Sequence, residues 1–251
     1  MSEKENLEEN EFTKEIIDFF RDLVIIIAIV LFTTQFFVSI FIIKGQSMSS
    51  SYYDKEWILV DRFTTNSFWW VKDRDIKRWD VVVVEPWVNK NKKYFIKRII
   101  WLPNEELKIE WGNVFLKKVW EKEFSKLNEK YLNKENYWKT RTDNDSIIYK
   151  IPDGKYFVMG DNRNHSSDSR SCFYYSCSSI DRDNYIFEKN VVWKVLLDFG
   201  YINFDIQFFD SKWNFNFEYN GIKLTHPVIK EDWKYISTKP KWTNSVDSYN
   251  Y

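Results

Sequence analysis

A polar run near the middle of the chain holds the residue types that could do chemistry. Residues 160–170, GDNRNHSSDSR, contain no aliphatic side chain and directly follow a strand-like segment, residues 156–159. The charged residues of the run are Asp161, Arg163, Asp168 and Arg170. Acids and arginines can pair and hold a loop in one conformation, and loops of fixed shape are where sites are built. The charges by themselves leave two interpretations open, an ordered functional loop and a solvated connection.

A lysine at position 97 lies within a predicted strand, residues 93–100. Strand alternation places Lys97 on the same face as Phe95 and Ile99, whereas Arg98 points the other way. Because that face is apolar, the lysine amine should lose its charge more easily than a solvated amine. A solvent-facing lysine is the alternative. A neutral amine is the form that can act as a general base.

A lysine base is of interest because a serine hydroxyl needs a base, and histidine, the usual one, is scarce here. The two histidines are His165, inside the polar run, and His226, near the C-terminus. A Ser-Lys dyad is a recognised variant of the Ser-His-Asp triad. Ser47 stands out among the serines by its position, directly after a long uncharged segment.

Composition excludes several other classes of function. The 37 basic and 37 acidic residues cancel, so a nucleic-acid partner, which would favour a basic excess, is not indicated. Cysteine and histidine do not occur at metal-ligand spacing, and no glycine-rich phosphate loop is present. We therefore expect no metal and no cofactor.

The uncharged segment is residues 23–43, which as one helix would be about 31 Å long, the thickness of a bilayer core. It is predicted to be a transmembrane anchor. A cleaved signal peptide, which would need a small-residue cleavage site, and a buried core helix are the alternatives. The acidic residues 1–22 before it are predicted to be a disordered tail that passes into a helix.

Most of the remaining chain has the pattern of short strands. The predicted strands are residues 56–62, 81–84, 93–100, 156–159, 186–187 and 191–197, with hairpins at 107–110/113–116 and 204–209/215–219. The fold class that follows is a mostly antiparallel β-domain.

The polar run resembles the most diagnostic motif of the bacterial type I signal peptidases, membrane-bound serine proteases that remove signal peptides. The resemblance extends to Ser47-Met48 after the anchor, to Arg78-Trp79-Asp80 before a valine-rich strand, and to Lys97-Arg98 in a strand ending at Leu102-Pro103. The chain departs from the family where Ser49-Ser50-Ser51 replaces x-Pro-Thr, and the resemblance ends near residue 198.

The resemblance implies a role for each site residue. Ser47 corresponds to the nucleophile and Lys97 to its general base. Ser166 corresponds to a hydroxyl that orients the lysine amine, and an Asp168–Arg170 pair would brace the loop. The Ser47 backbone N–H is an expected oxyanion donor. Some relatives add a hydroxyl two residues earlier, a position held here by Gly45.

The resemblance also implies an organisation: a mainly β, antiparallel, barrel-like catalytic domain on one N-terminal transmembrane helix. The tail would be residues 1–22, the anchor 23–43, the catalytic domain 44–199 with a variable insert at 104–150, and 200–251 an extension without an assigned role. The protein would be a single-pass protein of the plasma membrane with its domain outside the cytoplasm. Its partners would be preprotein signal peptides, the lipid bilayer and, nearby, the secretion translocon. In that compartment a Cys172–Cys177 disulfide is favoured over two thiols.

Two other functions share part of this pattern. A repressor autoprotease of the SOS type uses Ser-Lys chemistry in a related β-fold, but it needs a DNA-binding helix pair, which residues 1–43 do not offer. A membrane-anchored β-domain that has lost activity is the second alternative, and its support is the altered segment Ser49-Ser50-Ser51.

The chain has 13 tryptophans and only 6 glycines. Trp79, Trp101 and Trp193 stand where the signal peptidases have glycine. One hypothesis is that the source reads UGA codons as glycine, whereas this translation reads them as tryptophan; the alternative is a chain that uses tryptophan as core. If the first holds, Trp79 and Trp101 should lie at exposed turns with little packing.

Overall fold

The computed structural model describes residues 2–62, 76–86, 93–137, 139–140, 142, 146–174, 184–209, 215–225, 228–231 and 234–237. For residues 2–12, 174 and 203 onward, only the backbone is considered. The chain divides into two compact units, Met1–Ser39 and Ile40–Tyr251.

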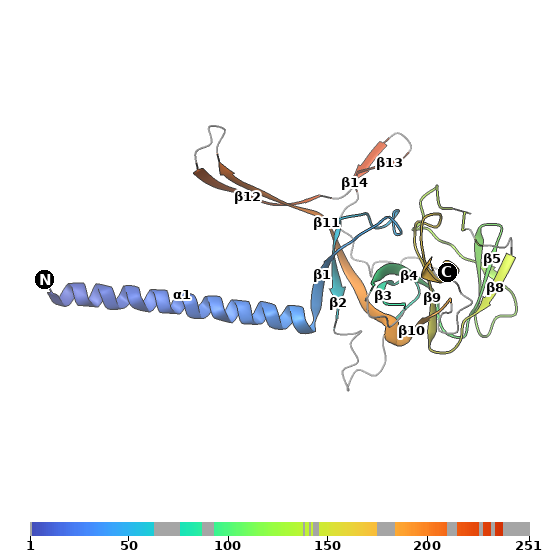
Figure 1. The fold of residues 1–251 in the computed structure, drawn as a ribbon, viewed down its shortest axis with the longest axis horizontal. Helices are drawn as coiled ribbons and strands as arrows, with labels where there is room; N and C mark the ends of the chain where they lie inside the picture. Colours follow the sequence, from blue (N-terminus) through green and yellow to red (C-terminus); the bar gives the residue numbers. More distant parts are fainter. Residues whose placement is uncertain are drawn as a thin grey trace. The chain divides into compact units, whose positions relative to one another are not determined.

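The first unit is built from one long helix, α1, which covers Ser2–Phe36 (Figure 1). Residues 1–22 were predicted to be a disordered tail that passes into a helix; the disordered part of that prediction is wrong, because the helix already begins at Ser2. The physical reason is composition: the first 44 residues contain no glycine or proline, and glutamate, lysine and leucine favour a helix. Arg21 adds a pair with Asp18 one turn earlier, at 2.6 Å.

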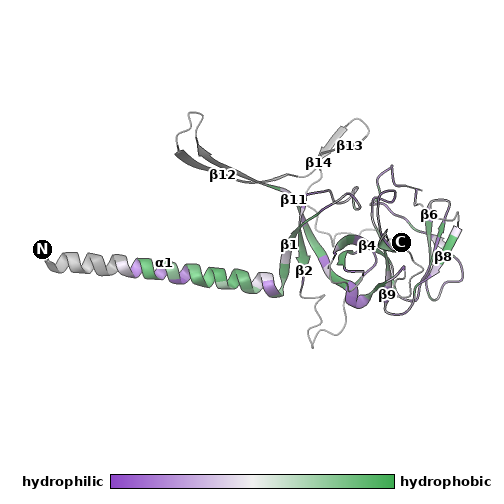
Figure 2. Cartoon of the chain, in the orientation of Figure 1, coloured by the Kyte–Doolittle hydropathy of each residue, from purple (hydrophilic) through white to green (hydrophobic). Residues whose placement is uncertain are grey.

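The prediction of a single helix over residues 23–43 is also wrong. The helix ends at Phe36, and Val38–Ile42 forms strand β1, which pairs with β2. The sequence VSIFI is β-branched and aromatic, so it suits a strand wherever a partner edge is available. Figure 2 shows the apolar part of α1 in green. Within the described residues, no helix combines the length and the apolar character needed to cross a membrane.

The second unit is mainly β and antiparallel, as predicted. Its large sheet has eight strands in the order β1-β2-β11-β3-β4-β9-β10, with β12 paired to β11. The remaining strands of this sheet are β2 Trp57–Asp61, β3 Val81–Val84, β4 Phe95–Trp101, β9 Lys155–Met159, β10 Ile186–Phe187, β11 Val191–Phe209 and β12 Phe215–Thr225. Two short 3-10 helices, Ser169–Tyr174 and Glu188–Asn190, flank β10.

A second, four-stranded sheet is made by the predicted insert, in the order β7-β6-β5-β8. Its strands are β5 Glu106–Glu110, β6 Asn113–Lys117, β7 Ser125–Lys126 and β8 Ser146–Lys150. The predicted hairpin at 107–110/113–116 is confirmed by the β5–β6 pairing. Between β7 and β8, the chain runs back toward the polar loop, where Arg163 contacts Glu129.

Strand β11 continues through the position predicted as the end of the catalytic domain. It pairs with β2 and β3 through Val191–Gly200 and then with β12 from Tyr201 onward. The predicted hairpin at 204–209/215–219 is confirmed by this second pairing. A further two-stranded sheet follows, β13 Val228–Glu231 with β14 Lys234–Ser237.

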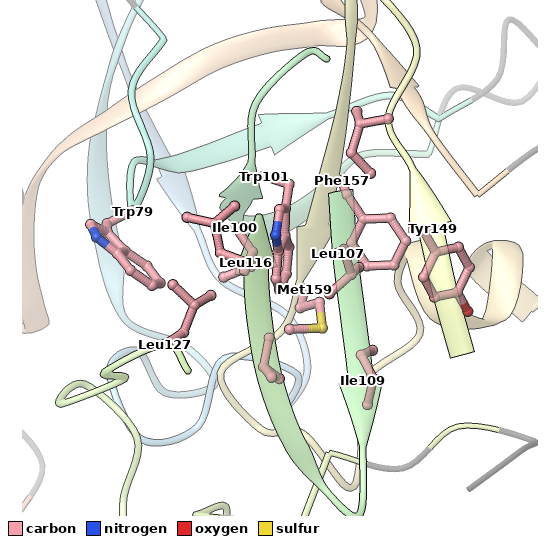
Figure 3. Packing of buried hydrophobic residues seen from close by; sticks show 12 residues of the cluster. Trp79, Ile100, Trp101, Leu107, Ile109, Leu116, Leu127, Tyr149, Phe157 and Met159 are labelled. Carbon is pink, nitrogen blue, oxygen red and sulfur yellow. The ribbon is translucent and has the colours of Figure 1, made fainter. Parts of the chain in front are cut away.

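The expectation that Trp79 and Trp101 are poorly packed is wrong. Trp79 is 6% exposed and Trp101 is fully buried. Figure 3 shows both indoles among the side chains that join the two sheets, with Leu107 and Phe157. Trp193, on β11, stacks on Phe41 with ring centroids 4.8 Å apart.

Two of these tryptophans nevertheless have energetically unfavourable local features. Trp79 has a φ of +75°, a left-handed conformation that costs a side-chain-bearing residue about 1–2 kcal/mol. The indole N–H of Trp101 is buried and lacks a hydrogen-bond partner among the described residues, a cost of roughly 1–3 kcal/mol. The core therefore has room for both indoles, but the backbone conformation at Trp79 and the unpaired N–H of Trp101 are unfavourable for tryptophan.

Peptide mass mapping of the protein purified from its native source tests the codon hypothesis. We predict glycine at positions 79 and 101, because the left-handed φ of Trp79 favours glycine and a glycine at 101 has no buried indole N–H. At position 193 the prediction of glycine rests on the codon hypothesis alone. Tryptophan masses at all three positions, or UGG codons in the gene, would reject the hypothesis. Trp57, which lies in strand β2, is the comparison position, at which a tryptophan mass is expected.

Candidate active site

Ser47 and Lys97 meet although 49 residues separate them in the chain. The Lys97 Nζ lies 2.7 Å from the Ser47 Oγ and 2.7 Å from the Ile96 carbonyl oxygen. Ser47 lies in the turn that follows β1, next to the fully buried Met48. Lys97 is on β4, opposite Val82 of β3. The sheet therefore brings a strand lysine against a turn serine.

The predicted orientation of Lys97 is confirmed. Its side chain is 1% exposed, and its Nζ lies 5.6 Å from the centre of the Phe95 ring, on the face that alternation indicated. Arg98 is directed to other partners, Asp161 and the Trp79 carbonyl. Arg98 is also buried, because β4 is covered on both faces.

Burial lowers the pKa of Lys97 to about 8, because removal from water disfavours the charged amine. The carboxylates of Asp168 and Asp161 oppose this shift, whereas the nearby Arg170 guanidinium adds to it. An amine with such a pKa is substantially neutral in mildly alkaline solution, so it can accept a proton.

The predicted Asp168–Arg170 pair is present and bidentate. Arg170 Nε and Nη2 donate to the two carboxylate oxygens of Asp168 at 2.9 and 2.8 Å. Arg170 Nη1 also donates to the carbonyl of Arg163, and the Gly160 N–H donates to Asp168 at 3.0 Å. Burial would raise the pKa of Asp168, but Arg170 and the Gly160 N–H hold it below its ordinary value. Asp168 therefore links the first residue of the loop, Gly160, to its last, Arg170, by hydrogen bonds.

Ser166 lies beside Gly160 at the base of the loop. A Cβ on Gly160 would come within 2.2 Å of the Ser166 Oγ and 2.3 Å of the Ser47 carbonyl oxygen, so the absence of a side chain there is required. The Ser166 Oγ is buried near Asp168, whose pKa the Ser166 side chain helps to lower, and among the described residues no hydrogen bond joins it to Lys97. The expected hydrogen bond from Ser166 to the lysine amine is therefore not formed, and Lys97 bonds to the Ile96 carbonyl instead.

Asn162 connects the loop to the nucleophile segment, a role that the residue pattern did not single out. Its backbone N–H donates to the Ser47 carbonyl at 3.1 Å, and its side-chain amide donates to the Gln46 carbonyl at 3.0 Å. Gly45, with a φ of +102°, donates its N–H to Asp54 at 2.7 Å. The Gly45 N–H is thus already engaged, and its position offers no hydroxyl.

Two further ion pairs of the loop reach outside it. Asp161 accepts two hydrogen bonds from Arg98, at 2.9 and 2.6 Å, and Arg163 pairs with Glu129 of the insert. The sequence signal for Asp161 and Arg163 was their charge in a polar run. Their partners could not be read from it, because Arg98 and Glu129 come from other parts of the chain.

The other candidates lie apart from this geometry. His165 is exposed on the loop, and His226 lies outside the described residues. Within the altered segment, Ser51 Oγ accepts a hydrogen bond from Arg98 at 3.2 Å.

Cys172 forms a disulfide, and Cys177, the chain's other cysteine, lies outside the described residues. Across the described part of the chain, no group of three or more acidic, histidine or cysteine side chains is arranged to hold a metal ion.

Comparison with known proteins gives a consistent set of relatives. Signal peptidase I P from Bacillus subtilis subsp. natto is 32% identical over 162 residues, which cover 62% of this chain and 79% of that protein. Signal peptidase I from Bacillus amyloliquefaciens is 31% identical over 170 residues, covering 67% of this chain and 84% of that one. The crystal structure of a signal peptidase I from Enterococcus faecalis V583 is 22% identical, covering 49% of this chain and 97% of that chain, with a TM-score of 0.35.

The family model described as signal peptidase, peptidase S26, matches residues 16–194. This range includes the Ser47–Lys97 contact and the whole of the polar loop, and it leaves out β12 to β14. Because the match extends over more than half of the sequence and contains the site just described, the chain belongs to the signal peptidase family, peptidase S26, a family of serine endopeptidases.

Proposed function

We propose that this chain cleaves N-terminal signal peptides from translocated preproteins, with Ser47 as nucleophile and Lys97 as general base. The observation that carries the proposal is the 2.7 Å distance between the Ser47 Oγ and a lysine amine that is 1% exposed. The names of the relatives, signal peptidase I, support the choice of substrate.

The proposed reaction begins with a neutral Lys97. The Ser47 hydroxyl transfers its proton to Nζ as Oγ attacks the carbonyl carbon of the scissile peptide bond. The resulting ammonium then protonates the departing amine, which leaves an acyl group on Ser47. A water molecule, deprotonated in the same way by the neutral amine, hydrolyses this ester and restores the serine.

The negative charge of the tetrahedral intermediate requires a hydrogen-bond donor. We propose the backbone N–H of Ser47. Gly45 is unsuited to the second position, because its N–H donates to Asp54 and it has no side chain.

The polar loop has a supporting role in this proposal. The Asp168–Arg170 pair holds the loop closed, and Gly160 allows Ser166 to approach the Ser47 backbone. The Ser166 hydroxyl lies near Asp168, and rotation about its Cα–Cβ bond would direct it at the lysine amine when substrate binds. Such a hydrogen bond would orient the Nζ lone pair toward Ser47.

We propose that α1 attaches the protein to a lipid bilayer. From Leu23 to Phe36 the helix has no charged residue, and its large apolar side chains are mostly exposed in the chain alone. Exposure of this much apolar surface to water is unfavourable, and contact with lipid removes the cost. The proposed location is the outer face of the plasma membrane, near the translocon, where signal peptides of exported preproteins emerge.

An autoprotease with a DNA-binding helix pair is not favoured, because residues 2–36 form one helix. An inactive relative is not favoured either, since Ser47 and Lys97 are both present and in contact. The altered segment after Ser47 also has a structural use: Ser51 accepts a hydrogen bond from Arg98.

Substitution of the dyad should abolish cleavage. We predict that Ser47→Ala and Lys97→Ala each lower kcat on a peptide with an Ala-x-Ala cleavage site by roughly four to six orders of magnitude. His165→Ala is the control and should retain activity, because this side chain is exposed. Loss of activity in a folded His165→Ala, or normal activity in Lys97→Ala, would contradict the dyad.

The pH dependence follows from the state of Lys97. Below its pKa of about 8 the amine is protonated and cannot accept the serine proton, so kcat/KM should rise with pH and level off above about 8. The measurement is a pH profile on a neutral peptide substrate. A profile that is flat between pH 6 and about 9 would show that no group with this pKa acts as the base.

Gly160→Ala should disable the site. Its Cβ would overlap the Ser166 side chain and the Ser47 carbonyl, so we predict a fall in kcat of about 100-fold or more together with lower thermal stability. Gly154→Ala is the control: its φ is +67°, but nothing lies within 4 Å of the added Cβ. This control should lose about 1 kcal/mol of stability and keep its kcat. Equal kcat values for the two variants would show that Gly160 does not shape the site.

A further inference from the structure

Arg163 is a fully hydrogen-bonded side chain of the polar loop. It is 2% exposed, and all five of its N–H groups have acceptors. Nη1 donates to Glu129 at 3.0 Å and to the Thr140 hydroxyl at 2.9 Å. Nη2 donates to the other oxygen of Glu129 and to the Tyr131 hydroxyl, and Nε donates to the Gly160 carbonyl at 3.2 Å.

Three of these partners come from one segment, residues 127–140, which lies between β7 and β8 of the small sheet. Glu129 is itself buried, at 7% exposure, and Tyr131 donates its hydroxyl to Glu129 at 2.7 Å. The insert thus contributes a carboxylate and two hydroxyls that are aimed at a residue of the polar loop.

Tyr131 also contacts the arginine next to the proposed base. Its ring centre lies 4.2 Å from the guanidinium carbon of Arg98, a cation–π contact. Arg98 is held in turn by Asp161, at the start of the loop. One tyrosine therefore touches both arginines that hold this end of the loop, Arg98 with its ring and Arg163 with its hydroxyl.

The connection to the reacting atoms runs through Gly160. Arg163 Nε holds the Gly160 carbonyl, and the Gly160 Cα packs against Ser166 and the Ser47 backbone without room for a methyl group. The Arg163 carbonyl also receives a hydrogen bond from Arg170, which pairs with Asp168. A shift of Arg163 would therefore move Gly160, which packs on Ser47 and Ser166, and would disturb Arg170.

We propose that Glu129 and Tyr131 are positioning residues of the active site, which act through Arg163 to set the place of Gly160 and Ser166 against the Ser47–Lys97 pair. This role rests on the proposed dyad. It also gives the insert a role in catalysis, because its segment between β7 and β8 anchors the loop through Arg163.

Removal of the Glu129 charge would leave the buried guanidinium of Arg163 without its counter-charge, which is more than a loss of packing. A buried guanidinium without its counter-charge draws in water or moves toward it, and either response loosens the loop. The charged groups acting on the Lys97 amine are Asp168, Asp161 and Arg170, all in this loop. Water admitted there relieves the desolvation of the amine, so its pKa should rise toward the ordinary lysine value.

The test uses the full chain in detergent and compares Glu129→Gln and Tyr131→Phe with the natural sequence. Tyr131→Phe keeps the ring over Arg98 and removes only the hydroxyl. Glu123→Gln is the control, because it removes the same charge from an exposed position in the same insert. The readouts are kcat and KM on a signal-peptide substrate, and the titration of Lys97 followed by NMR of nitrogen-labelled lysine.

We expect a fall in kcat of roughly 10- to 100-fold in Glu129→Gln, a smaller fall in Tyr131→Phe and little change in KM. The Lys97 titration should move to higher pH in both variants and stay in place in Glu123→Gln. Variants that are folded, but have the natural kcat and an unmoved Lys97 titration, would overturn the proposal.

The two proposals fail in distinguishable ways. If the natural chain does not cleave the substrate, the dyad function is wrong, but the Lys97 titration still reports whether Glu129 and Tyr131 control the site. If Glu129→Gln does not fold, Tyr131→Phe decides alone, since it introduces neither an unpaired charge nor a new clash. A lowered melting temperature with an unmoved titration would indicate a purely structural role and reject positioning.

Discussion

The burial of one amine beside one hydroxyl is the constraint on which the rest of this site depends. Lys97 lies within β4, 1% exposed, and removal from water favours its neutral form. In water the same amine would be protonated near neutral pH and would be no base for Ser47. The environment is a central strand, paired with β3 on one side and β9 on the other, whose residues from Lys97 to Trp101 are all buried.

A buried amine next to charged residues requires that those charges be balanced. Arg98 with Asp161, Arg170 with Asp168 and Arg163 with Glu129 are each buried or nearly so. Such pairs contribute little net stability, because desolvation offsets their attraction, but an unpaired member is costly. Their effect is therefore geometric. Each pair fixes one part of the loop, and together they hold Gly160 and Ser166 in place. The loop charges that act on the Lys97 pKa, Asp168, Asp161 and Arg170, are all members of these pairs.

Several features were predictable because they depend on local pattern. Alternation placed Lys97 on an apolar face, and the valine-rich run, the Leu107 to Leu116 hairpin and the strand after Pro152 all form as expected. The Asp168–Arg170 pair was expected from the resemblance to the signal peptidases, and it is formed. The end of α1 was not: Val38–Ile42 is apolar enough to continue a helix, and it becomes a strand because β2 offers an edge. The tryptophans show the same limit, since Trp79 and Trp101 look like turn residues yet are buried in the core that joins the two sheets.

By itself, the sequence determined the chemistry that this protein can offer: a serine after an uncharged segment, a lysine within an apolar strand and a charged loop of recognisable order. These are properties of residue type and short spacing. Only the tertiary structure decided which groups meet. Ser47 reaches Lys97 across 49 intervening residues, and Arg163 finds Glu129 in an insert whose sequence gave no sign of it. The reason is physical: strand pairing fixes long-range neighbours through backbone hydrogen bonds and buried area summed over the whole sheet, and no single segment contains that information.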